Sequence, residues 1–145
     1  MRFSTFLVCS VFLCACGSDS DLRPFSSDGC SLFPDRSLLS ESDWCNCCFE
    51  HDVAYWLGGS AAEREAADRR LATCVSDMAG DSALADVMYE GVRLGGSPYF
   101  PTWYRWGYGW PEDRGYSELT PEETSLAARL LGENIEQARL NACPI

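Results

Sequence analysis

His51 is the only histidine in the chain, and it stands beside Asp52 in a stretch rich in cysteine. On a helix, Cys48 lies one turn before His51 and Tyr55 lies one turn after it. A disulfide at Cys48 is therefore expected to hold this helix beside the imidazole. Histidine is suited to remove a proton from water at neutral pH, as ester hydrolysis requires. We therefore expect His51 to act as a catalytic base.

A histidine base needs an acceptor that holds its second ring nitrogen. Asp68, on the next predicted helix, is our candidate, with Asp77 on the same helix as the alternative. Asp68 lies beside Ala67 and three residues before Leu71, so it borders the apolar face of that helix. The competing interpretation of Asp68 is a solvated acid paired with nearby arginines.

The cysteines predict disulfides. Nine cysteines are present, and three of them (Cys9, Cys14 and Cys16) lie in or next to an N-terminal leader. The six others are Cys30, Cys45, Cys47, Cys48, Cys74 and Cys143. An even number in an exported chain predicts three disulfides, among fifteen possible pairings. The alternative is a zinc site made by His51 with Cys45, Cys47 and Cys48, but that spacing is not a usual structural zinc pattern.

Residues 1–15 are typical of an export signal, because Arg2 precedes an apolar stretch too short to span a bilayer. The stretch ends in Leu13-Cys14-Ala15-Cys16, which resembles the lipobox of bacterial lipoproteins. That resemblance implies cleavage before Cys16, a lipid anchor on Cys16, and a place in the bacterial cell envelope facing the periplasm or the exterior. An ordinary signal peptide without an anchor is the alternative. Residues 16–27 are polar and predict a flexible tether.

The chain is strongly acidic, with 11 basic and 22 acidic residues and a formal net charge of −11. Removal of the leader takes away Arg2 and no acid, so 10 basic and 22 acidic residues leave a charge of −12. A body this acidic is a poor partner for nucleic acid and is repelled by anionic lipid surfaces. It is compatible with the binding of a cation.

Four helices are predicted, over residues 41–57, 60–80, 82–94 and 120–141. Capping boxes precede two of them, at Ser60 with Glu63 and at Thr120 with Glu123. Residues 97–119 hold eight aromatic side chains broken by proline and glycine. We expect an ordered loop there, with room for a short strand, that packs over the core or alternatively docks on a membrane. The predicted fold class is mostly α, a small disulfide-stapled helical domain over residues 28–145.

The pattern Cys48-x-x-His51-Asp52-x-x-Tyr55 resembles the active-site helix of the secreted phospholipases A2. Asp28-Gly29-Cys30-Ser31-x-x-Pro34-Asp35 is similar to the shortened calcium loop of their prokaryotic and fungal branch. Arg64-x-x-x-Asp68 stands where that branch has its second catalytic acid. The resemblance covers residues 28–96, and the aromatic loop at 97–119 has no counterpart in it.

This resemblance implies a phospholipase A2-like core in which His51 and Asp68 are catalytic and a calcium ion (Ca2+) is the cofactor. The implied ligands are carboxylate oxygens of Asp28 and Asp52 and the backbone carbonyl of Gly29. A backbone N–H of the same loop, from Gly29 or Cys30, is implied at the developing oxyanion.

The resemblance also implies a disulfide between Cys30 and Cys48. Of the remaining cysteines, Cys45 and Cys47 are too close in sequence to be expected partners of each other. We expect one of them to pair with Cys74 and the other with Cys143, and the sequence does not decide which.

The expected function is calcium-dependent hydrolysis of the sn-2 ester of a phospholipid by a His51–Asp68 pair that activates water. A monomer is expected, with a phospholipid or a membrane surface as its partner. The alternative is a non-catalytic envelope lipoprotein that uses the same scaffold for binding or structure. The acidic surface and the unmatched loop at residues 97–119 favour that alternative.

Overall fold

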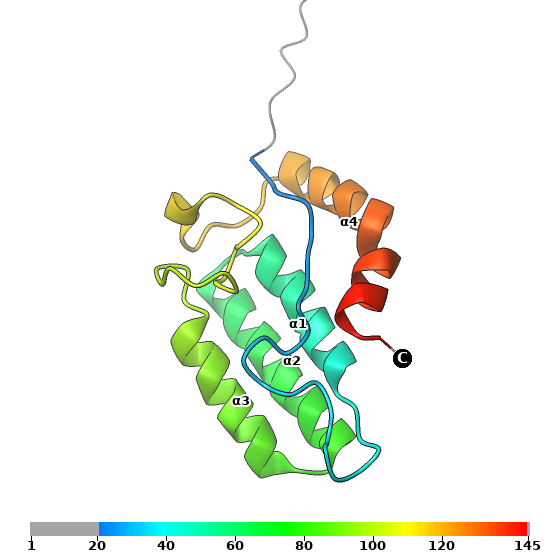
Figure 1. Ribbon diagram of the computed structural model, residues 1–145. Coiled ribbons are helices and arrows are strands. Elements are labelled where there is room, and N and C mark those ends of the chain that lie inside the picture. The colour runs from blue at the N-terminus through cyan, green and yellow to red at the C-terminus, as the bar shows by residue number, and fades with distance from the viewer. Residues whose placement is uncertain (1–20, 145) are drawn as a thin grey trace, which may run out of the picture.

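The computed structural model describes residues 21–144, which form four α-helices and one short 3-10 helix. They are α1 (Cys45–Leu57), α2 (Ala61–Ala79), α3 (Ser82–Gly95), η1 (Glu112–Arg114) and α4 (Pro121–Ala142). Figure 1 shows α1, α2 and α3 packed side by side, whereas α4 lies apart from α2 and α3 and contacts α1. Residues 21–144 contain no strand, and Arg36 and Asp43 make an isolated β-bridge. The predicted mostly α class is confirmed.

Both predicted capping boxes are present. Ser60 accepts a hydrogen bond from the N–H of Glu63, whose carboxylate accepts one from the N–H of Ser60, and α2 follows. Thr120 and Glu123 make the same exchange at the start of α4. Each box satisfies N–H groups that a helix leaves unpaired at its first turn. Local sequence therefore fixes where these two helices begin.

The predicted start of the first helix at residue 41 is wrong, because α1 begins at Cys45. Asp43 pairs with Arg36 across the β-bridge, and its carboxylate accepts a hydrogen bond of 2.9 Å from the N–H of Cys45. The indole N–H of Trp44 donates to the carbonyl of Pro34 at 2.6 Å. These contacts with the preceding loop hold residues 41–44 out of the helix.

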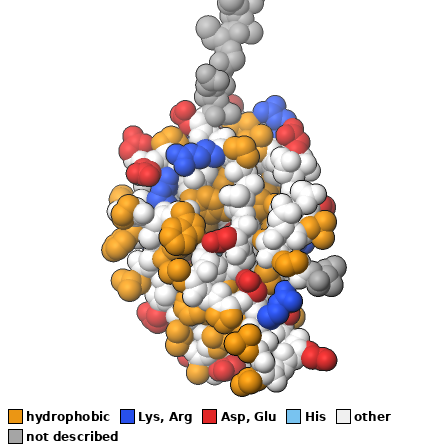
Figure 2. All heavy atoms as spheres, in the orientation of Figure 1, with side chains coloured by type: hydrophobic (Ala, Val, Ile, Leu, Met, Phe, Trp, Pro, Cys, Tyr) orange, Lys and Arg blue, Asp and Glu red, His pale blue; other side chains and the backbone are white. Residues whose placement is uncertain are grey.

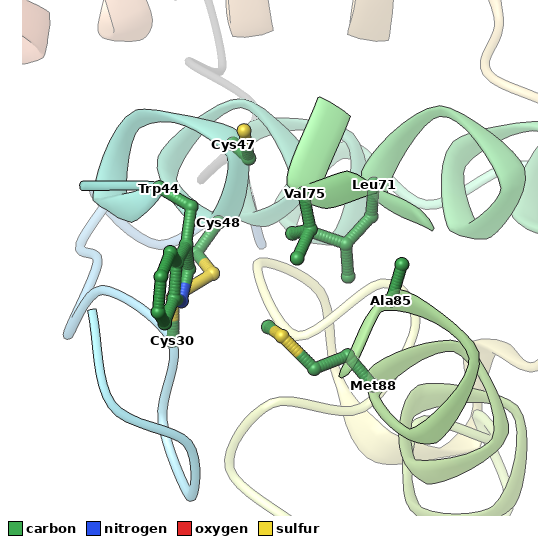
Figure 3. Close-up of a cluster of buried hydrophobic side chains, with 8 residues drawn as sticks. All are labelled: Cys30, Trp44, Cys47, Cys48, Leu71, Val75, Ala85 and Met88. Atoms are coloured by element: carbon green, nitrogen blue, oxygen red, sulfur yellow. A yellow bond between two sulfur atoms is a disulfide. The ribbon is translucent and has the colours of Figure 1, made fainter. Parts of the chain in front are cut away.

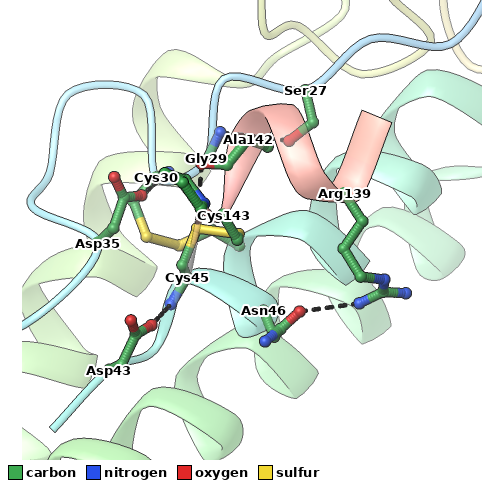
Figure 4. Close-up of a disulfide and its surroundings, with 12 residues drawn as sticks. Ser27, Gly29, Cys30, Asp35, Asp43, Cys45, Asn46, Arg139, Ala142 and Cys143 are labelled. Carbon is green, nitrogen blue, oxygen red and sulfur yellow. Dashed lines mark hydrogen bonds between the residues drawn. A yellow bond between two sulfur atoms is a disulfide. The ribbon is translucent and has the colours of Figure 1, made fainter. Parts of the chain in front are cut away.

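Three disulfides join the helices to one another and to the loop before them. Cys30–Cys48 ties the loop to α1, Cys47–Cys74 ties α1 to α2, and Cys45–Cys143 ties α1 to the end of α4. Figure 4 shows the last of these with its surroundings. Cys45, Cys47 and Cys48 are therefore all in disulfides and have no thiolate to bind zinc, so the alternative of a zinc site is wrong. Figure 3 shows how Cys30, Cys47 and Cys48 lie in the buried cluster of α1, α2 and α3, with Trp44, Leu71, Val75, Ala85 and Met88.

A second buried cluster lies between α1, α4 and the N-terminal segment 21–27. Leu22 and Phe25 from that segment pack with Phe49 and Trp56 of α1, and the indole N–H of Trp56 donates to the carbonyl of Arg23 at 2.8 Å. The segment, blue in Figure 1, runs between α1 and α4. The flexible tether predicted for residues 16–27 is therefore wrong for residues 21–27.

The predicted leader, residues 1–15, and the predicted anchor, Cys16, lie outside the described residues. None of the helices within residues 21–144 is both long and apolar enough to cross a bilayer.

The aromatic loop at residues 97–119 is ordered and folds against the end of α1. Trp106 and Trp110 are buried, and their indole N–H groups donate to the carbonyls of Gly59 and Leu57, at 2.8 Å each. Gly58 has a φ of +71°, and a Cβ there would lie 2.9 Å from the Cα of Gly107. The glycine turn after α1 therefore allows the loop to approach. The short strand allowed for in this loop does not form.

Candidate active site

A mostly apolar groove with a volume of about 460 Å³ opens between α1, α3 and the loop at residues 29–33. His51, Asp52 and Tyr55 of α1 line it. Four members of the cluster in Figure 3 also line it, namely Cys30, Cys48, Leu71 and Met88. Phe100, Thr102 and Tyr104 of the aromatic loop complete the wall. The loop therefore shapes the groove without filling it.

His51 and Asp68 lie together, as the sequence predicts. His51 Nε2 is 2.8 Å from Asp68 Oδ1, and the Asp68 side chain is completely buried. The two residues come from α1 and α2, which pack directly against each other and are joined by Cys47–Cys74. Asp77, the alternative acceptor, is exposed. The interpretation of Asp68 as a solvated acid is wrong.

Asp68 is held as a carboxylate by donors on both of its oxygens. Oδ1 also accepts a hydrogen bond of 2.7 Å from the hydroxyl of Tyr55, and Oδ2 accepts one of 2.7 Å from Arg93 Nη1. Burial by itself raises the pKa of Asp68, but the hydrogen bonds from His51, Arg93 and Tyr55 outweigh it and lower the pKa below its ordinary value. Asp68 is therefore ionised at neutral pH.

His51 is neutral at the same pH. Burial lowers the pKa of His51 below its ordinary value of 6.5, although the hydrogen bond with Asp68 opposes that effect. An ionised Asp68 accepts from the Nε2–H tautomer, which leaves Nδ1 unprotonated. Nδ1 makes no hydrogen bond within residues 21–144 and is not sealed from solvent. The ring therefore has a basic nitrogen that can take a proton from water.

Asp52 also lines the groove, but its environment is the opposite of that of Asp68. It is only 8 % exposed, and it accepts a hydrogen bond of 2.6 Å from the Ser27 hydroxyl. No arginine pairs with it within residues 21–144. Burial raises the pKa of Asp52 to about 8, and the nearby charges of Asp28 and Asp35 add to this rise. The buried carboxylate of Asp52 thus lacks a positive partner.

Asp28 and Gly29, the other predicted calcium ligands, lie in the loop before α1. Asp28 is exposed, and its carboxylate accepts hydrogen bonds from the Ser31 hydroxyl at 2.8 Å and the Trp103 indole N–H at 3.2 Å. Gly29 is buried with a φ of +76°, a conformation that glycine adopts without strain. The negative charge of Asp28 acts on the carboxylate of Asp52. The two acids are therefore electrostatic neighbours.

The two backbone N–H groups expected at an oxyanion are engaged within the chain. The N–H of Gly29 donates to the hydroxyl of Ser27 at 3.2 Å. The N–H of Cys30 donates to Asp35 Oδ1 at 2.8 Å, as Figure 4 shows. Neither group points at a free position in this arrangement. An oxyanion could use one of them only after Ser27 or Asp35 releases it.

The described residues contain no group of three or more His, Cys, Asp or Glu side chains placed to hold a metal ion. A cation at this end of the groove therefore depends on Asp52 and Asp28 together with backbone oxygens such as that of Gly29. Oxygen donors of this kind are the ligands that calcium prefers. Burial without a positive partner disfavours ionisation of Asp52, and a divalent cation at this position would supply the missing positive charge.

The predicted packing of the aromatic loop over the core is confirmed for part of the loop, and docking on a membrane stays a prediction. Trp106 and Trp110 belong to the core, whereas Tyr99, Phe100 and Trp103 are 74 %, 50 % and 64 % exposed. Leu94 of α3 is exposed as well, and so is Leu32 in the loop before α1. Phe100, Leu94 and Leu32 line the groove. Figure 2 shows hydrophobic side chains gathered on the part of the surface over α3 and its neighbouring loops.

Two arginines around Asp68 were not predicted as site residues. Arg64 of α2 donates through Nε to the Tyr55 hydroxyl at 3.1 Å, and through Nη2 to the carbonyls of Val92 and Arg93 at 2.8 Å and 2.7 Å. Its spacing of four residues from Asp68 is a sequence signal for a helical pair. Arg93 is 25 residues from Asp68, and only the packing of α3 on α2 reveals it.

These features define the class of the protein: a small, disulfide-bonded helical domain with a buried histidine–aspartate pair beside an apolar groove. Comparisons with protein-family models, curated proteins and solved structures find no significant match.

Proposed function

We propose that the protein is a calcium-dependent hydrolase that cleaves the sn-2 ester of a phospholipid at the bacterial cell envelope. The observation that carries the proposal is the 2.8 Å contact between His51 Nε2 and the buried carboxylate of Asp68, next to an apolar groove. A general base beside a cavity of this kind is suited to an ester with a long apolar chain.

In this reaction His51 Nδ1 takes a proton from water as the water oxygen attacks the ester carbonyl. Asp68 accepts the hydrogen bond from the Nε2–H group throughout and stabilises the imidazolium that forms. The proton then passes from Nδ1 to the glycerol oxygen as the bond between the carbonyl carbon and that oxygen breaks. The products are a fatty acid and a lysophospholipid, and His51 is neutral again.

Asp52, Asp28 and the carbonyl of Gly29 would hold the calcium ion, which when bound would polarise the ester carbonyl and offset the negative charge on its oxygen. The burial of Asp52 without a positive partner supports this assignment. Asp52 and His51 are adjacent on α1 and line the same groove. The ligand side chain and the base are therefore fixed by one helix.

The exposed hydrophobic residues near the groove fit a lipid surface. Tyr99, Trp103 and Leu94 together offer aromatic and aliphatic side chains of the kind that enter the membrane interface. The net charge of −11 favours zwitterionic over anionic lipid. We propose that a single copy of the chain docks through this surface, held near the membrane by a lipid on Cys16.

The second candidate is a non-catalytic envelope lipoprotein that binds an apolar ligand in the groove. It is favoured by the engagement of the Gly29 and Cys30 N–H groups with Ser27 and Asp35, which leaves neither of these two donors directed at an oxyanion. Under this candidate the groove is used for binding, and His51 has a structural role through Asp68.

The test is fatty-acid release from phosphatidylcholine vesicles labelled in the sn-2 chain, measured with added calcium and with a chelator. We expect release that the chelator abolishes and that His51→Ala reduces to background. Asp77→Asn, an exposed acid on α2, is the matched control and should keep full activity. Release that persists in the chelator contradicts the calcium dependence. No release from the folded wild-type protein with calcium contradicts the hydrolase and favours the second candidate.

A further inference from the structure

Asp68 has its two carboxylate oxygens satisfied from opposite sides. Oδ1 accepts hydrogen bonds from His51 and Tyr55 of α1, at 2.8 Å and 2.7 Å. Oδ2 accepts a hydrogen bond from Arg93 Nη1 of α3 at 2.7 Å. The orientation of this carboxylate therefore depends on α3 as well as on α1.

A buried carboxylate needs a positive charge close to it, and two arginines are near. Arg64 is the more distant, with Nε 3.9 Å from Asp68 Oδ2. Its donors are directed elsewhere, to the hydroxyls of Tyr55 and Tyr116 and to two carbonyls at the end of α3. Arg93 alone among the described arginines donates a hydrogen bond directly to Asp68.

Arg93 is itself held in place at the last turn of α3. Its backbone carbonyl accepts a hydrogen bond of 2.7 Å from Arg64 Nη2, and its guanidinium reaches back over α2 to Asp68. The Arg93 side chain is 30 % exposed, and Glu65 of α2 lies close enough for the two charges to interact. Arg93 is therefore at the rim of the site and does not line the groove.

We propose that Arg93 is a positioning residue for the His51–Asp68 pair: it holds Asp68 Oδ2 so that Oδ1 faces His51 Nε2. Without Arg93, Oδ2 is buried with no donor, and the carboxylate turns its charge toward Arg64. That rotation takes Oδ1 away from the imidazole, so the hydrogen bond that favours the Nε2–H tautomer over the Nδ1–H tautomer is lost. Arg93 thus acts on the base through Asp68 and touches neither water nor lipid in the groove.

The test uses the fact that the chain contains one histidine, so its NMR spectrum has one pair of imidazole nitrogens. In the wild-type protein at neutral pH, ¹⁵N shifts should show the Nε2–H tautomer, with a downfield proton signal from the bond to Asp68. We expect Arg93→Gln to lose that signal and to populate the Nδ1–H tautomer. Arg93→Lys, which keeps a charged donor, should restore most of the signal. Arg69→Gln, an exposed arginine paired with Glu65, is the control and should match the wild type.

Backbone amide spectra establish that each variant is folded, and Arg93→Met, which keeps the aliphatic stem, replaces Arg93→Gln if that variant does not fold. A folded Arg93→Gln or Arg93→Met protein with an unchanged Nε2–H signal overturns the proposal. Equal loss of the signal in Arg93→Lys and Arg93→Gln also overturns it, because a charged donor would then not be what matters.

The catalytic meaning of this role rests on the proposed hydrolase, whereas the NMR test needs no substrate. If the wild type releases fatty acid, Arg93→Gln should lower kcat and leave KM unchanged, because Arg93 is not in the groove. If no activity is found but the tautomer changes as expected, the hydrolase fails and the positioning role stands.

Discussion

The electrostatic environment of Asp52 predicts that Asp52→Asn stabilises the protein when calcium is absent. The pKa of Asp52 is raised from its ordinary value of 3.8 to about 8 in the folded protein. Because the pKa of Asp52 is higher in the folded than in the unfolded protein, its contribution to folding stability is complete below pH 3.8. That contribution is lost as the pH rises toward 8. Asparagine is neutral throughout and has no such loss.

The size of this effect at pH 7 follows from the distance between pH 7 and the ordinary pKa. That distance is about three pH units, and each is worth about 1.4 kcal/mol, so taking up a proton at Asp52 on folding at pH 7 costs about 4 kcal/mol. The amide replaces the protonated carboxyl in the hydrogen bond with Ser27, and we allow roughly 1 kcal/mol of the gain for that exchange. We therefore expect Asp52→Asn to be about 3 kcal/mol more stable than the wild type at pH 7.

The assay is urea unfolding of both proteins from pH 4 to pH 8 in the presence of a chelator. The difference in unfolding free energy should grow as the pH rises. With calcium at about 100 times its Kd, the wild type should gain about 2.7 kcal/mol and Asp52→Asn should gain almost nothing. Asp77→Asn, an exposed acid on α2, controls for the change of charge. A difference that stays constant from pH 4 to pH 8 would refute the reasoning.

Two further predictions concern calcium and the aromatic loop. Calcium binding at pH 7 should release a proton from Asp52, because the pKa of Asp52 is about 8. Calorimetry of calcium binding in buffers of different ionisation enthalpy measures this proton release. A binding heat that is the same in all buffers contradicts the prediction. Trp106→Ala should destabilise the fold by about 3–5 kcal/mol because Trp106 is buried. Trp103→Ala should change stability by less than about 0.5 kcal/mol because Trp103 is exposed, while weakening sedimentation with phosphatidylcholine vesicles; equal effects of the two variants on stability would show that the loop is not divided in this way.

Local signals in the sequence predict those parts of the fold that depend on neighbours along the chain. The capping pairs Ser60–Glu63 and Thr120–Glu123 set the starts of α2 and α4 through contacts three residues apart. The start of α1 was missed because it depends on contacts of Asp43 and Trp44 with residues 34–36. Residues 21–27 look like a tether by composition, but Leu22 and Phe25 find a core made by α1 and α4.

The same distinction applies to the site. His51 and Asp68 were predicted together because their residue types and the motif around them suggest a pair across two helices. Arg93 carries no such signal, because arginine near a helix end is common and its partner is 25 residues away. The use of the Cys30 N–H by Asp35 is equally hidden, since a sequence does not show which way a loop carboxylate turns.

The two acids near His51, Asp52 of α1 and Asp68 of α2, differ in their electrostatic environments. Asp68 is buried with Arg93 as its positive partner, which makes it an ionised acceptor for the imidazole. Asp52 is nearly as buried but has no such partner, so its pKa moves in the opposite direction. Carboxyl groups whose pKa values are driven apart by their surroundings mark a division of roles in a site. A fold that needed only stability would gain by replacing Asp52 with a neutral residue, and this cost supports the proposal that Asp52 holds a cation.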